Sequence, residues 1–344
     1  MHRFFDPISP ISSILLQLIW FHLLLGLSST SPAADTDFFR NKTITYIVGT
    51  KPGGGYDTYA RLIAKYLEKH LPETRIVVEN VPGAGHIIAV NRLYRTTPDG
   101  LTIGTFNTGL LYAQLLQYEG VQFNLRDLGW IGKAASDPRV LVVGQQTPFQ
   151  SIDAVRASET PLLLATSGVG AASHNDMALL AQALGLKVRF VHNYGGSEGE
   201  MAILRGDITG MLGSYSALRR FVENGYGTIL LRVGSAPELD SSIPAAEELV
   251  TDETGQDLIR LITTFSKLGR LTAAPPGISD ARLAVLREAY RQALEDPHLL
   301  AEADRLDLPI DPLFGEAVDK QIKASLAQTP SIIDLIRSIL SPDQ

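Results

Sequence analysis

The segment from Ile44 to Leu67 combines an apolar strand, a glycine loop and an amphipathic helix. The loop is Pro52-Gly53-Gly54-Gly55, and we expect the helix to begin near Asp57. Consecutive glycines let the backbone approach a bound molecule closely, because no side chain stands in the way. The N–H groups at the helix start point back at the loop and favour a carboxylate or a phosphate. The segment therefore predicts a site for a small anion on an α/β scaffold.

The same order of strand, polar loop and helix recurs along the chain, which is typical of an α/β fold with largely parallel sheets. Four loops share this setting: Gly53 to Asp57, Asn107 to Gly109, Thr166 to Ser173, and Tyr194 to Ser197. Ligands of open α/β sheets bind beyond the carboxyl ends of the strands, where these loops lie. The alternative is that each loop is rich in glycine only because its turn requires it.

Two features predict a second domain inserted into the first. Trp130 to Lys133 and Arg139 to Val143 resemble two strands with no helix between them, and Ile262 to Ala274 resembles an extended apolar return segment. We therefore expect residues 34–135 plus 262–344 to form one lobe and residues 136–261 a second, joined by a hinge.

The first 33 residues resemble a secretory signal peptide. An apolar run from Ile11 to Leu27 precedes Ser31-Pro32-Ala33, a cleavage site of small residues. The alternative is an uncleaved membrane anchor, for which this run is short. The chain has no cysteine, so disulfides are excluded, and an exported chain without disulfides suits a bacterial periplasm. Cleavage leaves about 311 residues, enough for two domains.

Charge and motifs exclude several classes of protein. The net charge is −7 and no basic cluster occurs, which argues against nucleic acid or an anionic membrane as partner. The histidines lack the spacing of a metal site, and no phosphate-binding P-loop or complete dinucleotide fingerprint occurs. We predict neither a metal nor a cofactor.

One catalytic pattern is present. Gly195 to Gly199 satisfies G-x-S-x-G, so Ser197 could be the nucleophile of a hydrolase. A triad would also need a downstream histidine, and His298 is the only one, in a surface-like helical context. We favour Ser197 as a helix N-cap and predict no enzyme activity.

Specific motifs relate the chain to a known family. P-G-G-G-x-D at Pro52 to Asp57, E-N-x-P-G-A-G at Glu79 to Gly85, and a P-D-G turn at Pro98 to Gly100 follow one another in order. This order resembles the extracytoplasmic solute receptors of tripartite tricarboxylate transporters, the Bug or TctC-like family. The similarity continues through Thr166 to Gly168, Tyr194 to Ser197 and Pro275 to Gly277, and so spans essentially the whole mature chain.

The resemblance implies a type II periplasmic binding protein (Venus-flytrap) fold whose two hinged lobes close on a small organic carboxylate. The closed form would deliver this ligand to a membrane permease, and we expect a monomer. A receptor that serves a sensor protein would bind the same ligands and is the alternative. The ligand-binding residues implied by the family motifs, taken together with Tyr56, are Gly53, Gly54, Gly55, Tyr56, Asp57, Asn107, Thr108, Ser167, Gly168, Ser173, Tyr194, Gly195 and Ser214.

The chain departs from the family pattern at four places. Lys51 stands where the family often has proline, Tyr56 occupies a variable site, and His86 replaces a frequent glycine. These three residues could enlarge or recharge the pocket. Gly213 stands where an aspartate is common, which disfavours a ligand that carries an amine.

Overall fold

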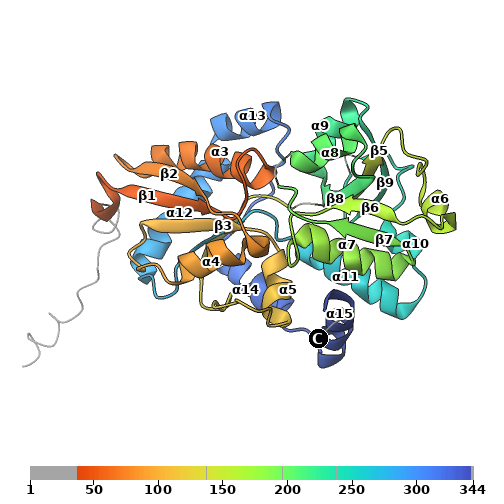
Figure 1. Cartoon of the computed structure of the whole chain (residues 1–344). Coiled ribbons are helices and arrows are strands. Elements are labelled where there is room, and N and C mark those ends of the chain that lie inside the picture. Colours follow the sequence, from red (N-terminus) through yellow and green to blue (C-terminus); the bar gives the residue numbers. More distant parts are fainter. Residues whose placement is uncertain (1–36, 137, 196, 238, 342–344) are drawn as a thin grey trace, which may run out of the picture.

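The computed structural model describes residues 37–136, 138–195, 197–237 and 239–341. They form two β-sheets, each covered by helices, which lie side by side as two lobes (Figure 1). The predicted signal peptide, residues 1–33, lies outside the described residues. Within the described ranges, no helix has the length and apolar character needed to cross a membrane.

The first lobe is built on a six-stranded sheet with the order β11-β4-β10-β3-β1-β2. Its strands are β1 (Thr43–Val48), β2 (Arg75–Asn80), β3 (Thr102–Phe106), β4 (Gly129–Lys133), β10 (Leu271–Ala274) and β11 (Leu313–Phe314). Strand β1 is parallel to β2 and β3, whereas β10 and β11 are antiparallel to their neighbours. The helices that accompany this sheet are α3 (Gly55–His70), η1 (Ala84–His86), α4 (Ile87–Tyr94), α5 (Gly109–Leu115), α12 (Asp280–Glu295), α13 (Pro297–Arg305) and α14 (Gly315–Ser325).

The second lobe is built on a five-stranded sheet with the order β7-β6-β8-β5-β9. Its strands are β5 (Arg139–Gly144), β6 (Leu162–Ala165), β7 (Val188–Val191), β8 (Gly210–Ser214) and β9 (Gly227–Val233). Strand β6 is parallel to β7 and β8, and β5 is antiparallel to β8 and β9. Its helices are α6 (Ile152–Ala157), α7 (Ala172–Leu184), α8 (Glu198–Arg205), α9 (Tyr215–Glu223), α10 (Ala246–Leu249) and α11 (Glu253–Ser266).

The chain crosses between the lobes through two segments that lie side by side. One follows β4 and the other precedes β10, and these two strands are neighbours in the first sheet. The N–H of Ala134 donates to the carbonyl of Arg270 at 3.3 Å, which ties the two crossovers together. The predicted α/β fold of two lobes joined at a hinge is therefore confirmed. The expectation of largely parallel sheets is wrong, because both sheets are mixed: the strands next to the crossovers pair antiparallel with their neighbours.

The amphipathic helix predicted after the glycine loop is α3. In α3 the stripe Tyr59, Leu62, Ile63, Tyr66 and Leu67 is at most 4% exposed. Residues recurring every three to four positions lie on one face of a helix, so their burial fixes the rotation of α3 against the sheet.

The expectation of an extended segment from Ile262 to Ala274 is wrong in its first part. Helix α11 continues to Ser266, and only Leu271–Ala274 forms a strand. The apolar residues Leu258, Leu261, Ile262 and Phe265 recur at helical spacing and are buried where α11 packs on α7.

The residue limits of the two lobes stay a prediction, and two elements bear on them. The expected boundary at residue 262 falls inside α11. The last helix, α15 (Pro330–Leu340), packs on α7 of the second lobe, beside which it lies in Figure 1.

Candidate functional site

A small pocket of about 130 Å³ lies where the strand-end loops of the two lobes meet. Its lining residues are Thr50, Gly54, Gly55, Tyr56, His86, Asn107, Arg139, Ser167, Ala172, Ser173, Ser214, Ala217 and Arg270. Larger hollows, of about 570, 660 and 320 Å³, lie elsewhere and include none of the glycine-loop residues. The small pocket is the better candidate because glycine-loop residues, helix starts of both lobes and two arginines line it.

Three helices from both lobes begin at this pocket. Gly54, Ala171 and Ser214 are the N-cap residues of α3, α7 and α9, and none of the three makes a side-chain capping bond. Each helix start carries about half a unit of positive charge, and its first N–H groups point away from the helix body. Three such ends at one small pocket create a strongly positive potential there.

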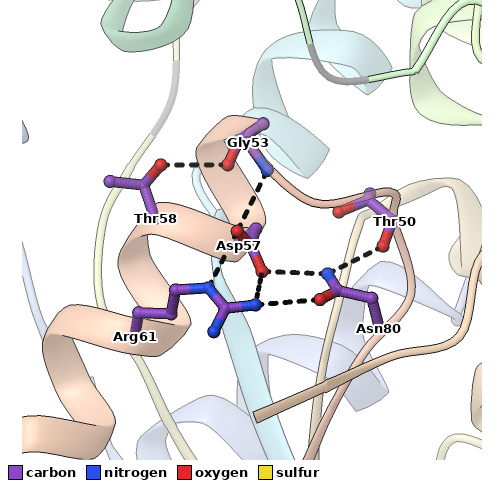
Figure 2. A network of polar contacts seen from close by, with 7 residues as sticks. Thr50, Gly53, Asp57, Thr58, Arg61 and Asn80 are labelled. Atoms are coloured by element: carbon purple, nitrogen blue, oxygen red, sulfur yellow. Dashed lines mark hydrogen bonds and ion pairs between the residues drawn. The ribbon is translucent and has the colours of Figure 1, made fainter.

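The glycine loop is held in shape by the buried carboxylate of Asp57 (Figure 2). Asp57 Oδ2 accepts from the N–H of Gly53 and from Nε of Arg61, both at 3.0 Å. Its Oδ1 accepts from Nδ2 of Asn80 at 2.9 Å, and Asn80 also donates to the carbonyl of Thr50 at 3.0 Å. Burial alone would raise the pKa of Asp57, but the bonds from Arg61, Gly53 and Asn80 outweigh it and lower that pKa. Asp57 thus shapes the loop from behind.

On the first lobe, Asn107 and His86 fix the next part of the wall. Asn107 Oδ1 accepts from the N–H of Gly109 at 2.8 Å, and the Asn107 N–H donates to Nδ1 of His86 at 3.3 Å. His86 is 4% exposed, and its ring meets that of Tyr56 edge-on at 5.3 Å. Burial, followed by the nearby charge of Arg270, lowers the pKa of His86 to about 3, so the imidazole is neutral at pH 7.

On the second lobe, three hydroxyl residues follow the strand ends. The N–H of Ser167 donates to Oγ of Ser173 at 3.2 Å, and Ser173 lies in the first turn of α7. Ser214 ends β8 and accepts from Nη2 of Arg270 at 3.3 Å. Hydroxyl groups at such positions can donate to a ligand oxygen.

The structure brings about half of the predicted ligand-binding residues to the pocket. Those that line it are Gly54, Gly55, Tyr56, Asn107, Ser167, Ser173 and Ser214. Those outside the lining set are Gly53, Asp57, Thr108, Gly168, Tyr194 and Gly195. Among the latter, Thr108 is buried beside Arg139, and the Gly195 N–H donates to Glu198 at 2.9 Å. Contact of any of these residues with a ligand stays a prediction.

Sequence reasoning missed two arginines, Arg139 and Arg270, which line the pocket and are 6% and 2% exposed. Each lies in or next to a crossover segment and borders an apolar strand. The sequence did offer one sign of these two residues: each arginine directly adjoins a run of apolar residues. Guanidinium groups are seldom buried without a partner or a role.

Arg139 is part of a buried polar network. Its Nε donates to Oδ2 of Asp176 at 2.8 Å and its Nη2 to Oγ1 of Thr108 at 3.3 Å. Tyr112 donates to the other oxygen of Asp176 at 2.9 Å. Burial raises the pKa of Asp176, and Arg139 and Tyr112 offset this only in part. Because Tyr112 and Thr108 belong to the first lobe and Asp176 to the second, this network also joins the lobes.

The structure also bears on two other kinds of site, a hydrolase nucleophile at Ser197 and a metal site. Ser197 is the N-cap residue of α8, as expected, although its side chain makes no capping bond. The described residues contain no cluster of three side chains suited to hold a metal ion.

Comparison with known proteins decides the family. Residues 59–336 match the family model described as "Tripartite tricarboxylate transporter family receptor", TctC. The chain belongs to this family. A UPF0065 protein of Bordetella pertussis (strain Tohama I) is 27% identical to it over 296 residues, which are 83% of this chain and 85% of that protein. TctC proteins are solute-binding receptors, so this receptor is not an enzyme and the hydrolase alternative falls.

Solved structures agree with the fold of the receptor. The periplasmic binding protein BugD superposes with a TM-score of 0.72 at 22% identity, covering 87% of this chain and 97% of that one. MatC of Rhodopseudomonas palustris with bound malate superposes with a TM-score of 0.69 at 20% identity, covering 86% of this chain and 98% of that one. The two lobes therefore have the fold of periplasmic binding proteins, as the motifs predicted.

Proposed function

We propose that this receptor works in the periplasm, binds a small organic carboxylate between its two lobes, and delivers it to a tripartite tricarboxylate-type permease. Export would depend on residues 1–33 acting as a signal peptide. We expect a monomer that needs no cofactor. The bound malate of the related MatC structure supports a carboxylate of similar size as ligand.

One observation carries this proposal: three helix N-termini and two buried guanidinium groups meet at one small pocket. Helix N-termini and arginines both favour anions, and arginine binds the two oxygens of a carboxylate with parallel bonds. The volume of about 130 Å³ favours a ligand of few carbon atoms.

Contacts with both lobes explain how binding would drive closure. The lining comes from α3 and η1 of the first lobe and from α7 and α9 of the second. A ligand shifts a conformational equilibrium only by binding one state better than the other. A carboxylate that touches both sets of residues binds the closed state better, and the permease would recognise that state.

The proposal is tested by thermal unfolding and calorimetry of the chain from Ala34 to Gln344. The panel comprises malonate, succinate, malate, glutarate, adipate, citrate and benzoate, with aspartate as the amine-bearing partner of malate. At one hundred times its dissociation constant, a ligand should stabilise the receptor by about 2.7 kcal/mol. A response to malate but not to the amino acid aspartate fits the proposal. It also fits the glycine at position 213, where other family members often have an aspartate side chain that could pair with an amine. A flat response to every acid refutes a carboxylate receptor.

A further inference from the structure

We infer that Arg270 binds the ligand carboxylate directly and sets the receptor's requirement for an anion. This inference rests on the proposed function. It concerns a residue outside the glycine-loop and strand-end motifs, carried by the crossover between the lobes.

Arg270 lies at the crossover between the two lobes. It directly precedes β10, and its carbonyl accepts from Ala134 of the other crossover. The residue is 2% exposed, yet it lines the pocket. Its guanidinium therefore reaches the ligand space from the hinge and is shielded from bulk solvent, where a charge-assisted bond is strongest.

Residues of both lobes hold the guanidinium in place. From the first lobe, the rings of Tyr56 and Tyr59 face it, with their centroids 4.2 and 4.8 Å from Cζ. From the second lobe, Ser214 and Ser216 accept from its Nη2, each at 3.3 Å. Aromatic faces stabilise a guanidinium without competing for its N–H groups in the plane, and hydroxyl groups fix its orientation. A planar group held in this way is preorganised for a carboxylate.

The backbone around Arg270 accommodates this side chain at a cost. Arg270 has a φ of 55°, in the left-handed region, which is unfavourable for an L-residue. Gly55 provides the space: a Cβ at that position would lie 2.9 Å from Nη2 of Arg270. Left-handed residues of this kind persist where the surrounding structure enforces them, often at ligand sites. Gly55 therefore leaves room for the guanidinium of Arg270 in addition to shaping the loop.

Arg139 provides the contrast. Its Nε and Nη2 bind Asp176 and Thr108, so it belongs to the wall and to the contact between the lobes. The positive charge of Arg270, by comparison, acts on another lining residue, because it contributes to lowering the pKa of His86. The two arginines therefore have different roles.

The test compares wild type, Arg270→Gln and Arg270→Lys in calorimetric titrations with malonate, succinate, malate, glutarate and adipate, each paired with its uncharged diamide. Arg270→Gln should weaken binding of the best diacid by about 10- to 100-fold, as expected for the loss of charge-assisted hydrogen bonds. It should weaken the diamide at least tenfold less, because a diamide has no carboxylate for Arg270 to bind. Arg270→Lys should recover part of the affinity, since it keeps the charge and loses the planar fork.

The matched control is Arg287→Gln, which removes a half-buried arginine that donates to the carbonyl of Trp130, away from the pocket. It should leave every affinity unchanged. If Arg270→Gln weakens diacid and diamide by the same factor, Arg270 has only a structural role and the inference fails. If Arg270→Gln binds as tightly as wild type, the inference fails while the proposed function stands. If the wild type binds no acid of the panel, both fail.

Discussion

The neutral, buried His86 should make the stability of the receptor depend on pH. In the folded protein its pKa is about 3, because the ring is buried and the charge of Arg270 lies nearby, whereas an unfolded histidine titrates near pH 6.5. Between these values the unfolded chain binds a proton that the folded chain does not. The free energy of unfolding therefore falls as the pH decreases from about 6.5 towards 3. From pH 7 to pH 5 the loss should be about 2 kcal/mol.

The perturbation that isolates this effect is His86→Asn. His86 has a φ of 81°, and asparagine tolerates the left-handed backbone better than most residues. An asparagine oxygen can accept the Asn107 N–H that now donates to Nδ1, and the amide does not titrate. Urea unfolding of the chain from Ala34 to Gln344 would be followed by the fluorescence of Trp130, its single tryptophan, which is 1% exposed.

The comparison runs at pH 8, 7, 6 and 5. At pH 8 histidine is neutral in both states, so the difference between the two proteins measures only the altered packing. As the pH falls to 5, wild type should lose about 2 kcal/mol more than His86→Asn, while every other titrating group cancels between them. Two stability curves that stay parallel from pH 8 to 5 would mean that His86 has the same pKa in the folded and the unfolded chain. That result would refute the reasoning.

Three further predictions concern the contact between the lobes and the loop. Gly109→Ala would place a Cβ 2.6 Å from the carbonyl oxygen of Gly170 and so push the lobes apart. It should weaken acid binding at least tenfold and raise the radius of gyration in X-ray scattering. Unchanged binding and size would refute a close approach of the lobes. Glu198→Gln removes an exposed ion pair between the lobes, in which Lys51 Nζ lies 2.8 Å from Oε2. Affinity at low salt should fall at most about fivefold, and 0.5 M NaCl should abolish the difference; an equal loss in high salt would rule out an ionic cause. Asp57→Asn should lower the free energy of unfolding in urea by about 1.5–3 kcal/mol, because the bonds from Gly53 and Arg61 lose their charged acceptor. A stability equal to that of wild type would contradict the role of Asp57 in supporting the loop.

Local pattern determined much of this fold from the sequence alone. Helical spacing of apolar residues identified the amphipathic helix α3, and the order of strand, loop and helix identified two α/β lobes. These features are local because the period of a helix or a strand is set by its own backbone geometry. Glycine loops after strands likewise led to the pocket, since the carboxyl ends of parallel strands share one edge of a sheet.

Tertiary structure alone decided which side chains face the pocket. Asp57 belongs to the strongest motif of the sequence, yet it turns behind the loop to bind Arg61 and the Gly53 N–H. Arg139 and Arg270 carry no motif. Arg270 lies against Tyr56 and Tyr59, which are more than two hundred positions away in the sequence, and Arg139 binds Asp176, 37 positions away. Gly85 belongs to the second motif, and only the folded chain shows that a Cβ there would meet the Gly170 backbone of the other lobe. Sequence spacing fixes the direction of a side chain relative to its own element, whereas the partner it meets depends on how distant elements pack.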